Sequence, residues 1–160
     1  AGYELANSTA KFRWDAYDPN YDPTAAAEAP REYDPIARGK RVYNNCLACH
    51  QANGQGIPGV YPPLAQSDWV GKSVDVLARI VVNGAQGEMV VNGNTYNGVM
   101  TAFGNLSDKE VAEVLSYIRN SWGNNYSIVT EEEVAAVRAE IGGRTSAYTA
   151  DELLALESGE

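Results

Sequence analysis

The chain has 160 residues and a formal net charge of −9, with only two cysteines and one histidine. This length fits one domain with tails, and no apolar run reaches the ~20 residues that cross a bilayer. Acidic residues are concentrated in residues 1–34 and 130–160, whereas residues 35–129 are close to neutral. No basic face is therefore expected for nucleic acid, which is excluded as a partner.

Residues 1–34 are expected to form an extended arm, because turn-forming and linker-like segments dominate them. A first helix is predicted from Asp34 to about Asn45. Asp34 can cap this helix, and Pro35 takes the first helical position, where proline is tolerated. Gly39 lies inside the helix, where glycine costs up to ~1 kcal/mol, and it therefore indicates close approach of another helix.

The predicted helix leads into Cys46-Leu47-Ala48-Cys49-His50. A Cys-x-x-Cys-His sequence is the attachment signature of c-type haem. A structural zinc site usually needs four ligands, a thioredoxin-like site needs a βαβ context, and a disulfide within the motif would close a short, strained loop. The sequence therefore predicts one haem c, bound covalently through Cys46 and Cys49, with His50 as an axial ligand.

The next segment, residues 51–66, is rich in glycine and proline and is predicted to be irregular. A helical turn is expected at residues 67–71. Ser73 then caps a helix that continues to about Val82 and stops at Asn83-Gly84.

Residues 88–97 are predicted to form a β-hairpin, because Asn92-Gly93 is the preferred pair for a tight turn. A loop over residues 98–104 follows. Three capping boxes then predict three helices. They are formed by Ser107 with Glu110, Thr130 with Glu133, and Thr149 with Glu152.

The second axial position of the haem iron decides the function, since a second strong ligand makes an electron carrier and an open site permits catalysis or gas binding. With one histidine and no third cysteine, the candidates are the thioethers of Met89 and Met100. Met100 lies in the glycine-bounded loop, which can wrap the far face of the haem. Met89 lies in a predicted strand, where a packing role suffices. Met100 is therefore the expected ligand, with His50 opposite.

The chain resembles a class I c-type cytochrome. The resemblance covers about residues 35–138 and rests on several motifs, which are Gly39-x-x-x-Tyr43, the Cys46–His50 motif, Pro62-Pro63-Leu64, Met100 and residues 117–124. It is strongest for the cytochrome modules of alcohol and sugar dehydrogenases, copper nitrite reductases and respiratory complexes. Two departures are Thr101, where many relatives have proline, and Met89 in the hairpin.

The resemblance implies a mostly α, class I cytochrome c fold with a small β-hairpin, an extended N-terminal arm and extra C-terminal helices. We expect an arm at 1–34, a haem domain at 35–129 and an acidic helical extension at 130–160.

The resemblance also implies roles for individual residues. The carbonyl of Pro62 or Pro63 is expected to accept the ring N–H of His50. Trp69, Arg79 and Tyr96 are candidates for positions near the haem propionates. The alternative roles are core packing for Trp69 and Tyr96 and a solvated helix face for Arg79.

The leading functional hypothesis is an electron-transfer protein that is not an enzyme. Its expected partners are a periplasmic dehydrogenase, a quinol-oxidising complex, or a terminal oxidase or reductase, and the arm and acidic flanks also suit docking to a membrane complex. The alternative is a haem enzyme or gas-binding haem protein with an open iron site. Because haem c is attached outside the cytoplasmic membrane in bacteria, we expect an exported protein, in the periplasm or on the outer face of that membrane, whose export signal or anchor has been removed.

Overall fold

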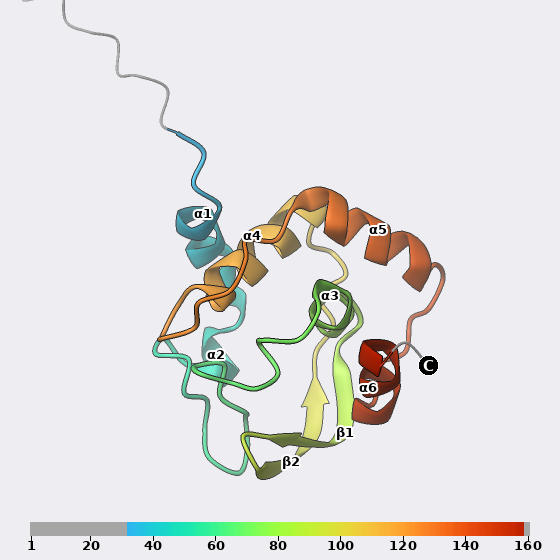
Figure 1. The fold of residues 1–160 in the computed structure, drawn as a ribbon. Coiled ribbons are helices and arrows are strands. Elements are labelled where there is room, and N and C mark those ends of the chain that lie inside the picture. The colour runs from blue at the N-terminus through green and yellow to red at the C-terminus, as the bar shows by residue number, and fades with distance from the viewer. Residues whose placement is uncertain (1–31, 159–160) are drawn as a thin grey trace, which may run out of the picture. The chain divides into compact units, whose positions relative to one another are not determined.

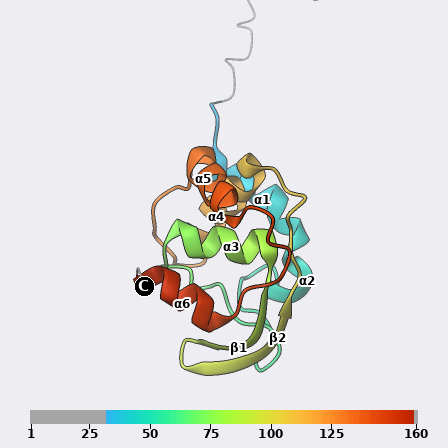
Figure 2. The same ribbon diagram turned by 90° about the vertical axis from the view of Figure 1, so that its right-hand side faces the viewer.

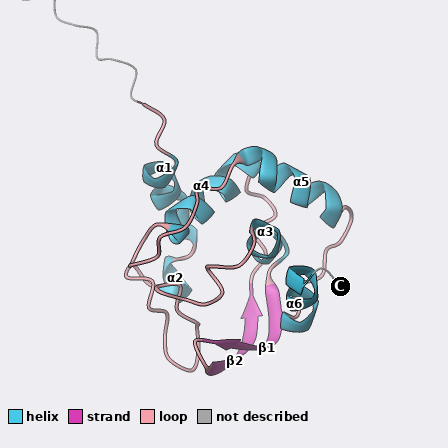
Figure 3. Cartoon of the chain, in the orientation of Figure 1, coloured by secondary structure: helices cyan, strands magenta, loops and turns pink. Residues whose placement is uncertain are grey.

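The computed structural model describes residues 32–158, so most of the arm expected over residues 1–34 lies outside the described residues. From Asp34 onward the chain forms one unit. Helices and loops dominate it, and one hairpin supplies its strands (Figures 1 and 3). The elements are α1 (Pro35–Val42), a 3-10 helix (Tyr43–Asn45), α2 (Leu47–His50), α3 (Val74–Asn83), β1 (Ala85–Val91), β2 (Asn94–Met100), α4 (Asp108–Arg119), α5 (Glu131–Ile141) and α6 (Ala150–Ser158). The prediction of a mostly α fold with a small hairpin is confirmed.

The helices begin where local sequence predicts. The Asp34 carboxylate accepts hydrogen bonds from the backbone N–H groups of Ile36 and Ala37, which caps α1. The predicted capping boxes at Ser107 and Thr130 are both formed, with Glu110 and Glu133 completing them. The end of the first helix differs from the prediction, because the α-helix stops at Val42 and tightens into a 3-10 turn before the cysteine motif.

Helices α1 and α4 cross at Gly39, as the glycine inside the first helix suggested. A Cβ atom at Gly39 would lie 1.9 Å from the carbonyl oxygen of Glu113 on α4. One turn further along the chain, the Tyr43 ring contacts the Tyr117 ring with 5.3 Å between the centroids. The missing side chain thus lets the helix that leads into the cysteine motif rest directly on the backbone of α4.

The hairpin is longer than the sequence predicted. Its turn is at Asn92-Gly93, but the antiparallel register continues to the pair Ala85 and Met100. The pair Gly87 and Gly98 lies within this stretch, and backbone hydrogen bonding needs no side chains there. Met100 therefore ends strand β2, and the prediction that it lies in a loop is wrong.

The C-terminal helices pack within the same unit. Helix α5 contacts α3 and α4, and α6 contacts α3 and β1, so α3 lies between them (Figure 2). The side chains of Val134 on α5 and Leu153 on α6 are fully buried. Among the described residues, no helix has both the length and the apolar character that crossing a membrane requires.

Candidate haem site

The cysteine motif is shaped by a single helical turn. Cys46 follows the 3-10 helix, and its carbonyl oxygen accepts backbone hydrogen bonds from Cys49 at 3.3 Å and His50 at 2.9 Å. This turn is α2, and it presents both thiols and the imidazole from five consecutive residues. Covalent haem attachment requires that two thiols reach the vinyl groups and an imidazole reaches the iron from one short segment, and α2 meets this requirement.

The His50 imidazole is buried and oriented by a backbone carbonyl. Its Nδ1 lies 2.9 Å from the carbonyl oxygen of Pro62. A carbonyl only accepts, so Nδ1 carries the proton and Nε2 keeps its lone pair for a metal. Of the two prolines that the sequence offered, Pro62 is the acceptor and Pro63 is not, which corrects the expectation for Pro63 at this bond. Burial lowers the pKa of His50, against a smaller opposing effect of the Pro62 bond, and this favours the neutral ring that binds iron.

The two thiols are free and half-buried. Burial, followed by the influence of Cys49, raises the pKa of the Cys46 thiol to about 11. A dithiol that exchanges disulfides instead needs a lowered pKa, because the thiolate is the nucleophile. The environment therefore does not support the thioredoxin-like alternative, and it leaves Cys46 as a thiol that can add to a vinyl group.

The structure gives the two methionines different surroundings. Met89 faces Tyr96 across the hairpin and packs against the buried cluster that contains Tyr96. Met100 is half-buried at the end of β2, outside the three buried clusters described for residues 32–158. Packing accounts for Met89, and this difference favours Met100 as the residue with a ligand role.

Two candidate propionate neighbours, Trp69 and Tyr96, are buried in one cluster. The Trp69 indole N–H donates to the carbonyl of Val90 at 2.7 Å, so its polar atom is used to hold the hairpin. Their assignment to the propionates stays a prediction beside this packing role.

Arg79 is itself buried and has three side-chain partners. Its side chain donates to both carboxylate oxygens of Asp75, to Glu140 at 2.7 Å and to the Tyr148 hydroxyl at 3.1 Å. The bonds to Asp75 raise the pKa of Arg79 most, burial opposes them, and the bond to Tyr148 adds a smaller increase. The alternative that Arg79 lies on a solvated helix face is wrong, because only 6% of the residue is exposed. Its propionate role stays a prediction.

The motifs that carry the resemblance include Tyr43 and residues 117–124, and the structure brings their aromatic rings together. Tyr43, Tyr117 and Trp122 form an aromatic cluster with centroids 5.1–5.4 Å apart, and Cys46 packs against the same buried group. Tyr148 was missed entirely. Its only sequence signal was its place just before the third capping box, which predicts a helix start and not the contacts of the preceding residue.

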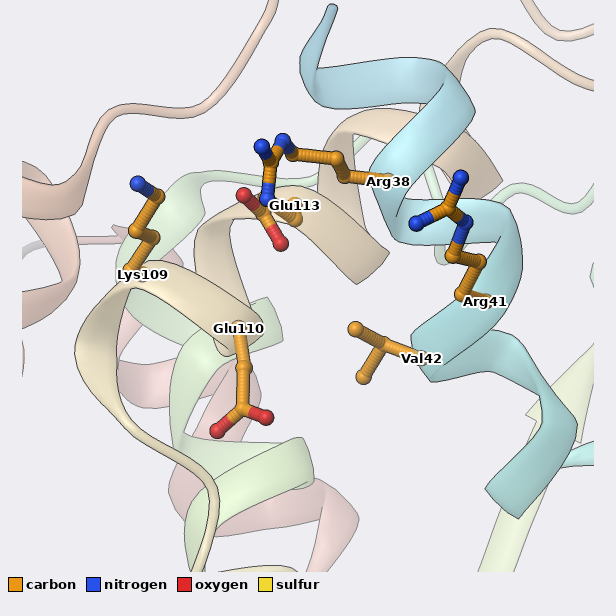
Figure 4. A pocket seen from close by; sticks show the side chains of 6 residues that line it. All are labelled: Arg38, Arg41, Val42, Lys109, Glu110 and Glu113. Carbon is orange, nitrogen blue, oxygen red and sulfur yellow. The ribbon is translucent and has the colours of Figure 1, made fainter. Parts of the chain in front are cut away.

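The described residues fit a haem c. They offer two free cysteine side chains, a neutral imidazole with Nε2 available and a thioether, which are the groups that attach the porphyrin and ligate its iron. A separate pocket of about 290 Å³ lies between α1 and α4 (Figure 4). Charged side chains dominate it, and its lining is Arg38, Arg41, Val42, Lys109, Glu110 and Glu113. None of the predicted haem residues lines this pocket, so it is not the cofactor site.

Comparison with known proteins points to the same chemistry. A profile of the family described as Cytochrome c matches residues 36–122. Cytochrome c-552 of Thermus thermophilus is 40% identical over 117 residues, covering 64% of this chain and 86% of that protein. The gluconate 2-dehydrogenase cytochrome c subunit of Pantoea cypripedii is 32% identical over 123 residues, covering 70% of this chain and 26% of the subunit. The cbb3-type cytochrome c oxidase subunit CcoP of Azospirillum brasilense is 36% identical over 92 residues, covering 52% of this chain and 30% of that subunit.

Proposed function

The chain belongs to the cytochrome c family, and we propose that it is a one-electron carrier in which His50 and Met100 are the two axial ligands. The haem c attached at Cys46 and Cys49 supplies the Fe(II)/Fe(III) couple when bound. The observation that carries the proposal is the orientation of His50, whose Nδ1–H is committed to Pro62 and whose Nε2 remains for iron. With both axial positions filled by protein groups, the site passes electrons and does not bind substrate.

The roles of the protein groups follow from their contacts. Pro62 holds the imidazole in one tautomer and orientation, which leaves Nε2 to bind the iron of the haem. The neutral thioether of Met100, as the second ligand, would favour the ferrous state and a relatively high potential. Ala48 is exposed between the two half-buried cysteines, and this surface is where we place the encounter with redox partners.

The proposed partners are a periplasmic dehydrogenase, a quinol-oxidising complex, or a terminal oxidase or reductase. Support comes from the relatives, which include a cytochrome c-552, the cytochrome c subunit of a dehydrogenase and a subunit of a cytochrome c oxidase. The proposed location is the periplasmic side of the cytoplasmic membrane, because haem c is attached outside that membrane in bacteria. The proposal includes that the chain is not itself an enzyme.

Matched leucine variants of the two methionines test the ligand assignment. Leucine keeps the volume and removes the sulfur. Met100→Leu should lose the weak long-wavelength charge-transfer band of methionine-ligated ferric haem, lower the potential and let the reduced protein bind carbon monoxide. Met89→Leu should leave all three unchanged. Loss of the band in Met89→Leu alone would show that Met89, and not Met100, is the ligand. Ready carbon monoxide binding by the unaltered protein would show that the iron site is open and would contradict the electron-carrier proposal.

A further inference from the structure

A segment beyond the family match pairs with the strand opposite Met100. The Tyr148 backbone N–H donates to Gly84 at 3.1 Å, and the Tyr148 carbonyl accepts from the N–H of Gln86 at 2.9 Å. These bonds form a parallel bridge between Tyr148 and Ala85. Ala85 is also the residue that faces Met100 in the hairpin register. The start of β1 is therefore held on one edge by Tyr148 and on the other by the strand end that carries Met100.

Gly84 connects the Tyr148 bridge to Met100 through a close contact between backbone atoms. It has φ +79°, and a Cβ atom on it would lie 2.3 Å from the Met100 carbonyl oxygen. Its own carbonyl is the acceptor for Tyr148, and its N–H donates to Ile80 at the end of α3. Because the backbone of Gly84 touches the backbone of Met100 directly, no flexible side chain can absorb a shift of residue 84.

The Tyr148 side chain is fixed from three helices. Its hydroxyl accepts from Arg79 on α3, which in turn pairs with Glu140 on α5 at 2.7 Å. The Arg144 guanidinium lies 3.8 Å from the centroid of the Tyr148 ring and pairs with Glu152 on α6. With only 4% of Tyr148 exposed, the residue has little freedom to move. The bridge to β1 is thus built on a rigid support.

We propose that Tyr148 is a positioning residue for the sixth ligand. By fixing Gly84 and Ala85 it fixes the backbone of Met100, and it thereby keeps the thioether within the few tenths of an ångström that a ligand site tolerates. This inference rests on the proposed function, in which Met100 ligates the iron. It gives the C-terminal segment a role at the haem that is separate from its packing on α3.

The test is a titration of the ferric holoprotein with imidazole, which competes with the methionine for the iron. Displacement of the methionine is monitored by the loss of the charge-transfer band. Tyr148→Ala should raise imidazole affinity at least about tenfold, the low end of what losing a supporting contact does to a metal ligand. The reduction potential of this variant should also fall. Tyr148→Leu keeps apolar bulk in the cluster, so its imidazole affinity and potential should change in the same direction but by less. This variant replaces the alanine variant in the test if the latter does not fold. Tyr148→Phe, which loses only the hydroxyl, should stay closest to the unaltered protein.

The matched control is Val134→Ala. Val134 is fully buried on α5, in a cluster that contains no residue of β1 or β2. This variant should lower the free energy of unfolding while leaving imidazole affinity unchanged. Equal affinities in the Tyr148 variants and Val134→Ala, at matched loss of stability, would overturn the inference. If Met100→Leu kept the band, the proposed ligand itself would fail. If Met100→Leu lost it and the Tyr148 variants behaved normally, only the positioning role would fail.

Discussion

Replacing Gly39 with alanine tests how tightly α1 rests on α4. The added Cβ would lie 1.9 Å from the Glu113 carbonyl oxygen, 2.5 Å from its carbonyl carbon and 2.7 Å from the Tyr117 Cβ. An ordinary contact begins at 3.4 Å, so α1 must move away by about 1.5 Å. Two of the three obstructing atoms belong to the backbone of α4, and no rotamer change relieves them.

Two opposing contributions set the magnitude. Alanine is favoured over glycine inside a helix by up to ~1 kcal/mol. Overpacking typically costs ~1–3 kcal/mol, and more where the backbone is the obstacle. The clash therefore exceeds the propensity gain, and we expect a net loss of about 2 kcal/mol in the free energy of unfolding. Because Tyr43 and Cys46 follow on the same stretch of chain, the shift should also perturb the haem absorption.

The assay is guanidinium unfolding of the holoprotein, followed by far-UV circular dichroism and by haem absorption. Ala37→Gly is the control, because Ala37 is exposed on the same helix and measures the propensity effect without a clash. It should lose up to ~1 kcal/mol. A Gly39→Ala protein as stable as the unaltered one would refute the argument, since it would mean that α1 can separate from α4 at no cost.

Two further predictions concern the hairpin and the C-terminal segment. In guanidinium unfolding, Gly84→Ala should lower the free energy of unfolding by ~1–3 kcal/mol more than Gly87→Ala. Both glycines have φ near +80°, but only a Cβ at position 84 would clash, at 2.3 Å from the Met100 carbonyl oxygen. Equal losses would show that the end of β2 can move to accommodate the added methyl group. Glu152 has its pKa lowered from 4.5 to about 2, first by Arg144 and then by a backbone N–H. A carboxylate whose pKa is lower in the folded state stabilises above its unfolded pKa and loses that contribution as pH falls through the folded value. Glu152→Gln should therefore flatten the decline of unfolding free energy between pH 4.5 and about 2, as measured by denaturant titration across that range, and an unchanged slope would contradict the pairing.

Local signals predicted local structure. Asp34, Ser107 and Thr130 begin helices in the structure because an N-cap depends only on the next three residues. Asn92-Gly93 fixed the hairpin turn for the same reason. The reach of the hairpin was underestimated, because the pairing of Ala85 with Met100 depends on backbone atoms that carry no sequence signature.

The surroundings of the site depend on distant residues and escaped prediction. Asp75 stands four residues before Arg79, a spacing that pairs charges on a helix and could have indicated a partner. Glu140 and Tyr148, the other two partners, are more than sixty residues away in the chain. No pattern within one segment specifies such contacts, so the sequence left open whether Arg79 was solvated.

The structure also changes how the acidic C-terminal flank is understood. From the sequence, its charge was expected to suit docking to a membrane complex. Several of its carboxylates have structural partners within the described residues. Glu133 completes a helix cap, Glu140 pairs with Arg79, Glu152 pairs with Arg144, and Glu157 accepts from Ser73 at the start of α3.

Glu140 links α5 to α3, Glu157 links α6 to the start of α3, and Glu152 links α6 to Arg144 beside Tyr148. These pairings are part of the support on which the proposed positioning of Met100 depends. Raising the salt concentration should therefore weaken these exposed ion pairs as well as the encounter with redox partners. If exposed pairs such as Arg144 with Glu152 contribute to that support, imidazole affinity should rise with ionic strength in the unaltered protein and rise less in Glu152→Gln. A salt response identical in the two proteins would assign the support to the buried contacts of Tyr148 and Leu153 alone.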